Sequence, residues 1–177
     1  MTFFPPEHFK WTTDLADNWT TIRDEFEQLH EAQLTRWHEL EIYSGEWDVF
    51  GLRAFGENME ENCTLCPVTT DLVTRIPGMT TAAFSILGPD THIKPHVGYT
   101  GDVLRYHLGL IVPDDCGLRV ENETRQWTEG SAMVFDDTKE HEAWNHSNET
   151  RTILLVDFAR PDDLPDQVQM EATQCQR

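Results

Sequence analysis

The second half of the chain is a series of short apolar segments separated by turn-forming residues. The segments are rich in Val, Ile, Leu and Phe, and the stretches between them, such as GPD, PDDCG and TEG, favour turns. Short strands bounded by turns are typical of a small all-β sandwich or barrel. The predicted strands are MTTAAFSIL (79–87), VLRYHLGLIV (103–112), GLRVE (117–121), SAMVF (131–135) and RTILLVDF (151–158).

The first part of the chain has the period of helices instead. Apolar residues recur at steps of three and four after Asp14, which predicts an amphipathic helix with Asp14 as its cap and an apolar stripe that covers one side of the sheet. The stretch CPVTTDLVTRIPG predicts a second short helix that Pro67 opens and that closes near Pro77 and Gly78. The stripe consists of Leu15, Trp19, Ile22, Phe26 and Leu29.

A chain of 177 residues is long enough to bury one sizeable core, and it needs no second domain. We therefore expect a single domain with a helical part over about 1–77, a β-barrel over about 78–160 and a polar, loosely packed tail over 161–177. The stretch CTLC (63–66) has metal or redox spacing, but no second pair of ligands follows at zinc-finger distance. We read it as a cysteine before a helix and assign it no chemistry.

The charge balance excludes several classes of partner. The chain has 32 Asp and Glu against 13 Lys and Arg, so it should repel nucleic acids and anionic membranes. The start, MTFFPPEHFKW, lacks the basic and apolar regions of a signal peptide, and no segment approaches the ~20 apolar residues of a membrane span. We expect a soluble, cytoplasmic protein that acts on a small molecule, an amino acid or a peptide, and we leave its oligomeric state open.

The predicted strand 103–112 has two unlike faces. Leu104, Tyr106 and further apolar residues alternate with Arg105, His107 and Gly109. A polar face of this kind is either solvated or lines the pocket of a small barrel, in which Gly109 would leave room for a ligand.

Two histidines and an arginine favour the pocket. His96 is expected in the loop before this strand, and His141 follows 45 residues later, just before the last strand. Arg151 opens that strand, which is otherwise almost entirely apolar, and a buried cation needs an anion. Each residue alone has an ordinary reading, as a surface or satisfied core histidine or a solvated arginine. Their combination is more specific.

Further distinctive stretches run along most of the chain between Asn18 and Pro161. They are NWTTIRDE (18–25), GEW (45–47), NCTLCPVT (62–69), FSILGPDTHIKPHVG (84–98), RYHLGLIVPDDCGLRVENETRQWTEG (105–130), FDDTKEHEAWN (135–145) and RTILLVDFARP (151–161). In this order they resemble the aspartyl/asparaginyl β-hydroxylases, a branch of the oxygenases that depend on Fe(II) and 2-oxoglutarate. Such long collinear similarity is stronger than any single motif.

The resemblance implies a fold, cofactors and roles for particular residues. The fold is a double-stranded β-helix, a jelly-roll-like barrel flanked by helices. The implied reaction uses Fe(II), O2 and the cosubstrate 2-oxoglutarate to hydroxylate an unactivated carbon. The resemblance implies that His96 and His141 bind iron, that Ser85 and Arg151 hold the far carboxylate of 2-oxoglutarate, and that Trp47, Arg105 and His107 line the cosubstrate site.

Two positions depart from related patterns. The commoner iron oxygenases have a carboxylate two residues after the first histidine, where this chain has Gly98, as is usual in the resembled family. Water would then take the third place on the metal, and Asp102 is the alternative that we retain. The second departure is Val103, where the animal hydroxylase has an additional arginine, so the resemblance leaves the substrate open.

The substrate implied first is the β-carbon of an aspartyl or asparaginyl unit, free, in a peptide or on a carrier. The same family includes lipid acyl-chain hydroxylases, which should carry membrane-associating segments that we do not find here. A different class is a cupin-like barrel that binds a metal without oxygenase activity, although cupins normally supply three or four ligands including a carboxylate. A third is a degenerate barrel that only binds, against which His96, His141 and Arg151 argue.

Overall fold

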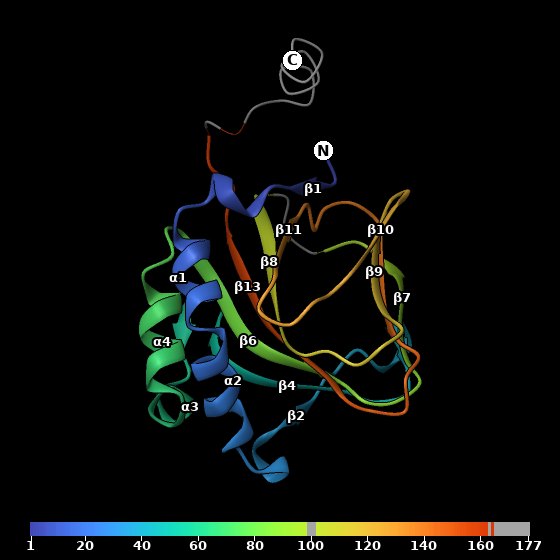
Figure 1. Cartoon of the computed structure of the whole chain (residues 1–177), viewed down its shortest axis with the longest axis horizontal. Coiled ribbons are helices and arrows are strands. Elements are labelled where there is room, and N and C mark those ends of the chain that lie inside the picture. The colour runs from blue at the N-terminus through green and yellow to red at the C-terminus, as the bar shows by residue number, and fades with distance from the viewer. Residues whose placement is uncertain (99–101, 163, 165–177) are drawn as a thin grey trace.

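The computed structural model describes residues 1–98, 102–162 and 164. Within this part of the chain, two antiparallel sheets face each other, and helices cover the outer side of the larger one (Figure 1). The helices are α1 (Trp11–Asp17), α2 (Trp19–Glu27), α3 (Glu60–Leu65) and α4 (Pro67–Thr74), with short 3-10 turns η1 (Pro6–His8), η2 (Glu31–Gln33) and η3 (Leu40–Ile42). Mainly β structure with flanking helices confirms the predicted fold class.

The two sheets divide the strands as follows. The larger sheet contains, in spatial order, β1 (Phe3–Phe4), β11 (Ala132–Phe135), β8 (Val103–Ile111), β13 (Arg151–Ala159), β6 (Met79–Leu87), β4 (Trp47–Ala54) and β2 (Thr35–Arg36), and β5 (Glu57–Asn58) pairs with β4. The smaller sheet contains β10 (Glu123–Gln126), β9 (Cys116–Val120), β12 (His141–Asn145), β7 (Thr91–His96) and β3 (Tyr43–Ser44).

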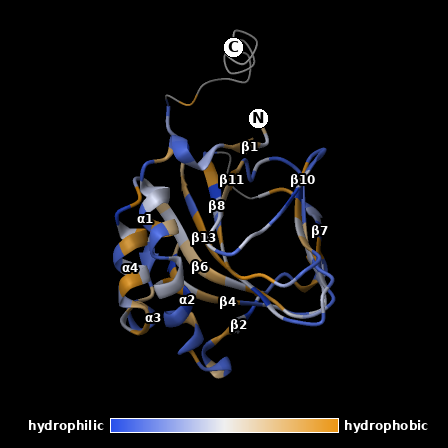
Figure 2. Cartoon of the chain, in the orientation of Figure 1, coloured by the Kyte–Doolittle hydropathy of each residue, from blue (hydrophilic) through white to orange (hydrophobic). Residues whose placement is uncertain are grey.

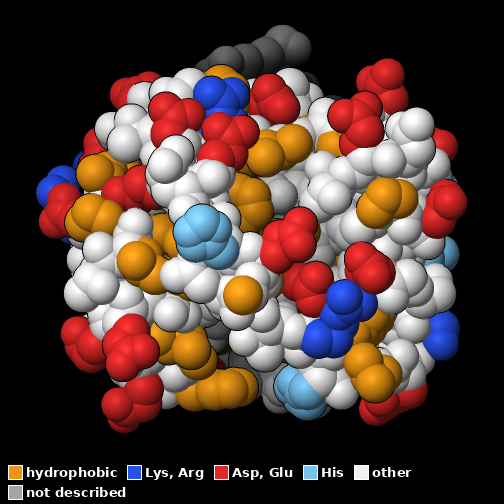
Figure 3. All heavy atoms as spheres, turned by 90° about the horizontal axis from the view of Figure 1, so that it is seen from below, with side chains coloured by type: hydrophobic (Ala, Val, Ile, Leu, Met, Phe, Trp, Pro, Cys, Tyr) orange, Lys and Arg blue, Asp and Glu red, His pale blue; other side chains and the backbone are white. Residues whose placement is uncertain are grey.

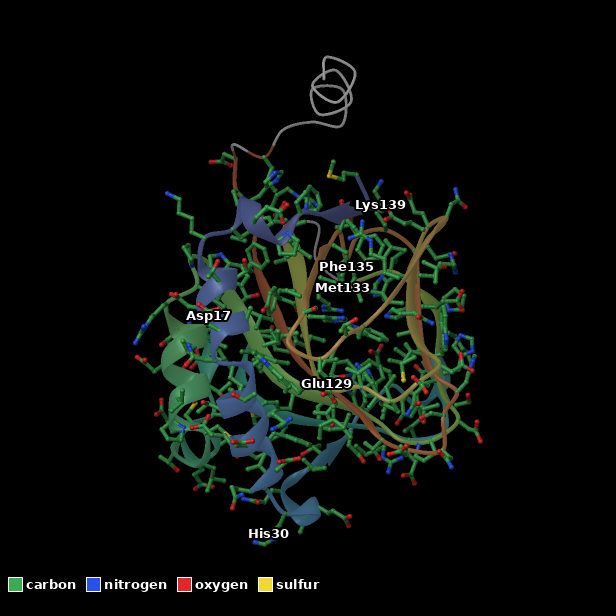
Figure 4. All side chains as sticks on the ribbon, viewed as in Figure 1. Asp17, His30, Glu129, Met133, Phe135 and Lys139 are labelled. Carbon is green, nitrogen blue, oxygen red and sulfur yellow. The ribbon has the colours of Figure 1, made fainter. Side chains whose placement is uncertain are left out.

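The core has two layers, one on each side of the larger sheet. Leu104, Tyr106 and Leu108 face the helices and pack with Leu15 and Ile22 of the helical stripe. Figure 2 shows the apolar residues of α4 and of the central strands in orange. Met133 and Phe135, both labelled in Figure 4, belong to the second layer between the two sheets. Full burial of such a side chain stabilises the fold by about 1.5–3 kcal/mol, so both faces of the larger sheet contribute.

The prediction of a helical part over about 1–77 is wrong in one important respect, because β4 lies within it and pairs with β6. The alternation of this strand is hard to read, since a register shift between Gly51 and Arg53 interrupts it. The predicted helix from Asp14 is also two helices, and Asp14 lies inside α1 rather than at its cap. Asn18, with a φ of −103° and a ψ of 11°, separates them, while Pro67 begins α4 as predicted.

Four strands of the smaller sheet, β3, β7, β10 and β12, were not predicted, and two of them carry the histidines. His96 is the last residue of β7 rather than part of a loop, and His141 is the first residue of β12. Pro95 makes β7 look unlike a strand, because proline cannot donate to a sheet ladder. The pairing of β7 with β12 shifts between His141 and Ala143, next to Pro95, which accommodates it. Most of the predicted tail lies outside the described residues.

Candidate active site

The two histidines lie directly opposite each other on neighbouring strands. His141 of β12 pairs in register with His96 of β7, and their ring centroids are 4.3 Å apart. His141 is buried, whereas His96 is partly exposed. The pair therefore sits at one end of the space between the sheets, with one ring toward solvent.

Backbone contacts assign the same tautomer to both rings. Nδ1 of His96 lies 2.8 Å from the carbonyl oxygen of Lys94, and Nδ1 of His141 lies 2.8 Å from that of Lys139. A carbonyl oxygen only accepts hydrogen bonds, so each Nδ1 carries a proton, and in the neutral form of either ring Nε2 keeps the lone pair. Burial lowers the pKa of His141 to about 3, which keeps this ring neutral. Both rings are thus suited to bind a metal ion through Nε2.

A buried carboxylate that no sequence pattern indicated lies beside this pair. Asp137 Oδ1 is 3.3 Å from His141 Nε2 and forms an ion pair with Arg105 Nη1 at 2.6 Å, without the geometry of a hydrogen bond. Asp157 holds the same guanidinium through two hydrogen bonds of 2.7 and 2.9 Å. A lone pair and a carboxylate oxygen at this distance repel each other, which favours a cation at this end of the site.

The position of Asp137 explains the glycine at residue 98. A Cβ atom on Gly98 would lie 1.7 Å from Asp137 Oδ2, and the Gly98 amide donates to the Asp137 carbonyl oxygen at 2.8 Å. The space beside residue 98 is therefore filled by a carboxylate from another part of the chain. Asp102, the alternative that the sequence left open, is exposed and does not line the cavity. Among the residues described, no group of three or more His, Cys, Asp or Glu is arranged to hold a metal ion.

Asp102→Ala should retain most of the metal affinity, because an exposed carboxylate away from the two histidines contributes little beyond surface charge. Titration of Mn(II) into wild-type and variant protein measures this, and affinities within about threefold are expected. A large loss of affinity with an unchanged thermal unfolding curve would instead place Asp102 at the metal.

The other end of the cavity holds a buried arginine. Arg151, the first residue of β13, is 1% exposed and is the largest fully buried side chain. Its guanidinium lies over the ring of Trp127 at 4.8 Å, and its Nε has no hydrogen-bond partner among the described residues. Burial lowers the pKa of Arg151 to about 9, so it is still a cation at neutral pH. An unpaired cation at this depth calls for an anionic ligand.

Three further residues named from the sequence line the same cavity. Trp47 Nε1 donates to Ser85 Oγ at 3.1 Å, which leaves the serine hydroxyl hydrogen free to donate elsewhere. His107 lies between the two ends, and neither of its ring nitrogens has a partner among the residues described. Burial and the guanidinium groups of Arg105 and Arg151 lower the pKa of His107 well below its ordinary value. Its ring is therefore neutral, with one donor and one acceptor.

The burial of neutral His107 should make the stability of the protein depend on pH. Below a pH of about 6.5 the unfolded chain binds a proton on this residue that the folded protein does not, so the free energy of unfolding falls as the pH decreases. One such group contributes at most about 1.4 kcal/mol per pH unit. In His107→Gln this contribution is lost, and the decline between about pH 6.5 and 5 should be shallower. Denaturant unfolding across this range measures it, and parallel declines would contradict the prediction.

The cavity that joins the two ends is narrow, with a volume of about 30 Å³. This is room for little more than one water molecule, so side chains along it must move when a larger ligand enters. Its wall combines residues of both sheets with the loop before β11. The lining residues are Trp47, Ser85, Ile93, His96, Arg105, His107, Leu118, Trp127, Phe135, His141, Ala143, Arg151, Ile153 and Leu155.

The role expected for Gly109 is wrong. A Cβ atom at this position would lie 2.5 Å from the carbonyl oxygen of Thr128, so the space is filled by the chain itself. The Gly109 amide donates to Ser131 O at 3.1 Å, and Gly130 N donates to Gly109 O at 2.9 Å. The glycine thus seats the loop that carries Trp127 and leaves no room for a ligand. No local pattern in the sequence distinguishes Trp127 from an ordinary core tryptophan.

The architecture is shared with solved oxygenase structures. An oxidoreductase of the 2OG-Fe(II) oxygenase family from Burkholderia pseudomallei has a TM-score of 0.59 at 12% identity, over 86% of this chain and 90% of that one. A prolyl-4-hydroxylase from Pseudomonas putida has a TM-score of 0.56 at 14% identity, over 86% of this chain and 98% of that one. At such low identity these similarities show the fold alone, which is a double-stranded β-helix.

Sequence comparison gives the family. The family model described as aspartyl/asparaginyl beta-hydroxylase matches residues 16–161, and the chain belongs to this family. An ornithine lipid ester-linked acyl 2-hydroxylase from Rhizobium tropici is 41% identical over 164 residues, which are 86% of this chain and 58% of that protein. The human aspartyl/asparaginyl beta-hydroxylase is 37% identical over 162 residues, 86% of this chain and 21% of that protein. The chain thus spans only part of these relatives, and membership of the family supports a hydroxylase.

The surface agrees with the sequence in its charge. The face shown in Figure 3 carries many more Asp and Glu than Lys and Arg side chains, as the formal net charge of −19 requires. In the described part of the chain, no helix is long and apolar enough to cross a membrane.

Proposed function

We propose that this protein is a dioxygenase that depends on Fe(II) and 2-oxoglutarate and that hydroxylates an unactivated carbon. The observation that carries the proposal is one cavity with two histidines at one end, each with its Nδ1 against a backbone carbonyl, and at the other end a buried arginine whose Nε has no hydrogen-bond partner among the described residues. A metal ion would satisfy the histidine end. A small molecule that binds this metal at one end and carries a carboxylate at the other would also satisfy the arginine. 2-Oxoglutarate, with an oxo acid at one end and a carboxylate at the other, has this chemistry.

The residues divide by the part of the cosubstrate they would hold. His96 and His141 would bind Fe(II) through Nε2, with Asp137 nearby to accept a hydrogen bond from a metal-bound water. Arg151 would grip the far carboxylate as a fork, and Ser85 would donate its free hydroxyl hydrogen to it. His107 would donate one hydrogen bond to the cosubstrate between the two ends. Trp47 would act indirectly, because its indole orients the Ser85 hydroxyl.

Arg105 has a different place from the other lining residues. Burial alone would lower its pKa, but the carboxylates of Asp157 and Asp137 raise it above the ordinary value, so it is a permanent cation. Its guanidinium is held by both carboxylates, and it would in turn hold Asp137 beside the metal site. We propose that Arg105 supports the part of the cosubstrate site near the iron by holding Asp137 in place.

When bound, Fe(II) would couple the oxidation of 2-oxoglutarate to succinate and carbon dioxide with the insertion of one oxygen atom of O2 into a carbon–hydrogen bond. The chain's own contribution would be to orient the cosubstrate and to exclude water. Phe135, whose ring contacts both His107 and His141 at centroid distances of 5.0 and 5.5 Å, keeps the region between the two ends apolar.

Two substrate classes follow from the family. An aspartyl or asparaginyl unit is the first candidate, and an acyl chain is the second. The second is favoured by the engagement of Arg105 with two carboxylates and by buried, apolar Val103, which leave little positive charge for an acidic substrate. The 41% identity to an acyl 2-hydroxylase points the same way.

The test is the oxygen-dependent formation of succinate from 2-oxoglutarate with Fe(II), followed by mass spectrometry of products. A panel of free amino acids, peptides and acyl conjugates should give one class with a mass increase of one oxygen atom. Turnover of 2-oxoglutarate without dependence on oxygen or iron would contradict the proposal. Metal binding without any turnover would favour the cupin-like alternative.

A further inference from the structure

Trp127 forms a partition between two cavities. It lies on the loop between β10 and β11 and is 4% exposed. It lines the narrow inner cavity of about 30 Å³ and also an outer cavity of about 370 Å³ on the other side. Arg151 lines the inner cavity, and its guanidinium stacks on the indole. The indole is therefore a wall at the arginine end of the proposed cosubstrate site.

The loop that carries this wall is fixed on two sides. Gly109 O accepts a hydrogen bond from Gly130 N, and Gly109 N donates one to Ser131 O. Glu129, labelled in Figure 4, accepts a hydrogen bond from the Val112 amide at 3.2 Å. On the other side, a Cβ atom at Gly130 would lie 2.9 Å from Trp19 Nε1. A wall seated this closely cannot recede far without disturbing β8 or α2.

The space behind the wall does not suit a carboxylate. The outer cavity is lined by Asp114, Asp115 and Glu129, whose negative charge repels an anion. The inner cavity has an unpaired Arg151 but little volume. A ligand carboxylate should therefore stay on the inner side, and the distance from the histidine pair to the indole limits how long the ligand can be.

We infer that Trp127 determines the length of the dicarboxylate cosubstrate by closing the arginine end of the cavity. This inference rests on the proposed function, since it assumes that 2-oxoglutarate binds between the histidines and Arg151. Trp127 would act in two ways. Its ring face stabilises the guanidinium through a cation–π contact that is shielded from solvent, and its bulk excludes a chain that is one methylene longer.

The experiment is calorimetric titration of Mn(II)-loaded protein with 2-oxoglutarate and with 2-oxoadipate, which has one more methylene. Wild-type protein should bind 2-oxoglutarate at least about 10-fold more tightly. Trp127→Ala should bind 2-oxoglutarate about 10- to 30-fold more weakly and should lose most of the preference, because the inner cavity opens into the outer one. Trp127→Phe keeps a ring over Arg151 and should keep the preference.

A matched control distinguishes the effect of removing this wall from the effect of removing any large tryptophan side chain. Trp144 is a partly exposed residue of β12 that does not line either cavity, so Trp144→Ala should leave both affinities unchanged. If Trp127→Ala does not fold, as judged by thermal unfolding and Mn(II) binding, Trp127→Leu tests the same point and should give an intermediate preference.

The outcomes separate the inference from the proposed function. Wild-type protein that binds Mn(II) but not 2-oxoglutarate would overturn both. Wild-type protein that binds 2-oxoglutarate, together with an unchanged preference in Trp127→Ala or Trp127→Leu, would overturn the inference alone. A reduced preference in these variants that Trp127→Phe restores would support it.

Discussion

Arg151→Ala is expected to weaken the binding of 2-oxoglutarate by roughly 30- to 5000-fold, because removal of one partner of a buried charge pair costs ~2–5 kcal/mol. The variant would delete the proposed bidentate contact with the cosubstrate, at a position where the arginine is 1% exposed. Arg151→Lys restores the charge but not the fork and should rescue binding only in part. Titration of 2-oxoglutarate into Mn(II)-loaded protein measures both effects.

The same position offers a control in the stability of the ligand-free protein. An unpaired buried cation is costly, so Arg151→Met, which fills a similar space with apolar atoms, should unfold at the same or a higher temperature than wild type. Mn(II) affinity should also survive, because Arg151 lies at the other end of the cavity from the histidines. Equal binding of 2-oxoglutarate by wild type and Arg151→Ala would place the cosubstrate elsewhere.

His96→Ala and His141→Ala are each expected to lower Mn(II) affinity by more than about 100-fold and to abolish oxygen-dependent turnover of 2-oxoglutarate. The reason is the small ligand set, since no group of three or more ligands is arranged to hold a metal among the described residues, and only His96 and His141 are paired at the proposed metal site. Loss of a supporting residue alone typically costs 10–100-fold in metal affinity, and loss of a ligand should exceed that.

His92→Ala is the matched control for this prediction. His92 lies on β7 like His96, but its Nε2 contacts Glu142 at 2.8 Å and it does not line the cavity. This variant should keep both metal affinity and turnover. Undiminished turnover in His96→Ala or His141→Ala would contradict the proposed metal site, whereas a loss in all three variants would point to a general disturbance of the smaller sheet.

Much of the larger sheet could be predicted from local pattern. β6, β8, β11 and β13 agree closely with the predicted strands because their alternation and apolar runs reflect burial on one or both faces. β7 and β12 escaped prediction because they are short and polar, and one contains Pro95. They exist because they pair with each other, while β12 also pairs with β9 and β7 with β3, and these are contacts between distant parts of the chain.

The sequence by itself identified many of the polar side chains that line the cavity. The order of His96, Arg105, His107, His141 and Arg151, with the residues around them, carried the resemblance and the fold class. Such information lies in short stretches and in their order along the chain, so it can be read without the tertiary structure.

Only the tertiary structure decided how these side chains are arranged. It placed Asp137 in the space beside Gly98, engaged Arg105 with two carboxylates, filled the space at Gly109 with a loop and set Trp127 against Arg151. These contacts join residues from separate strands and loops, and no spacing along the chain encodes them. Which buried charge finds a partner, and which is left for a ligand, depends on the packing of the two sheets.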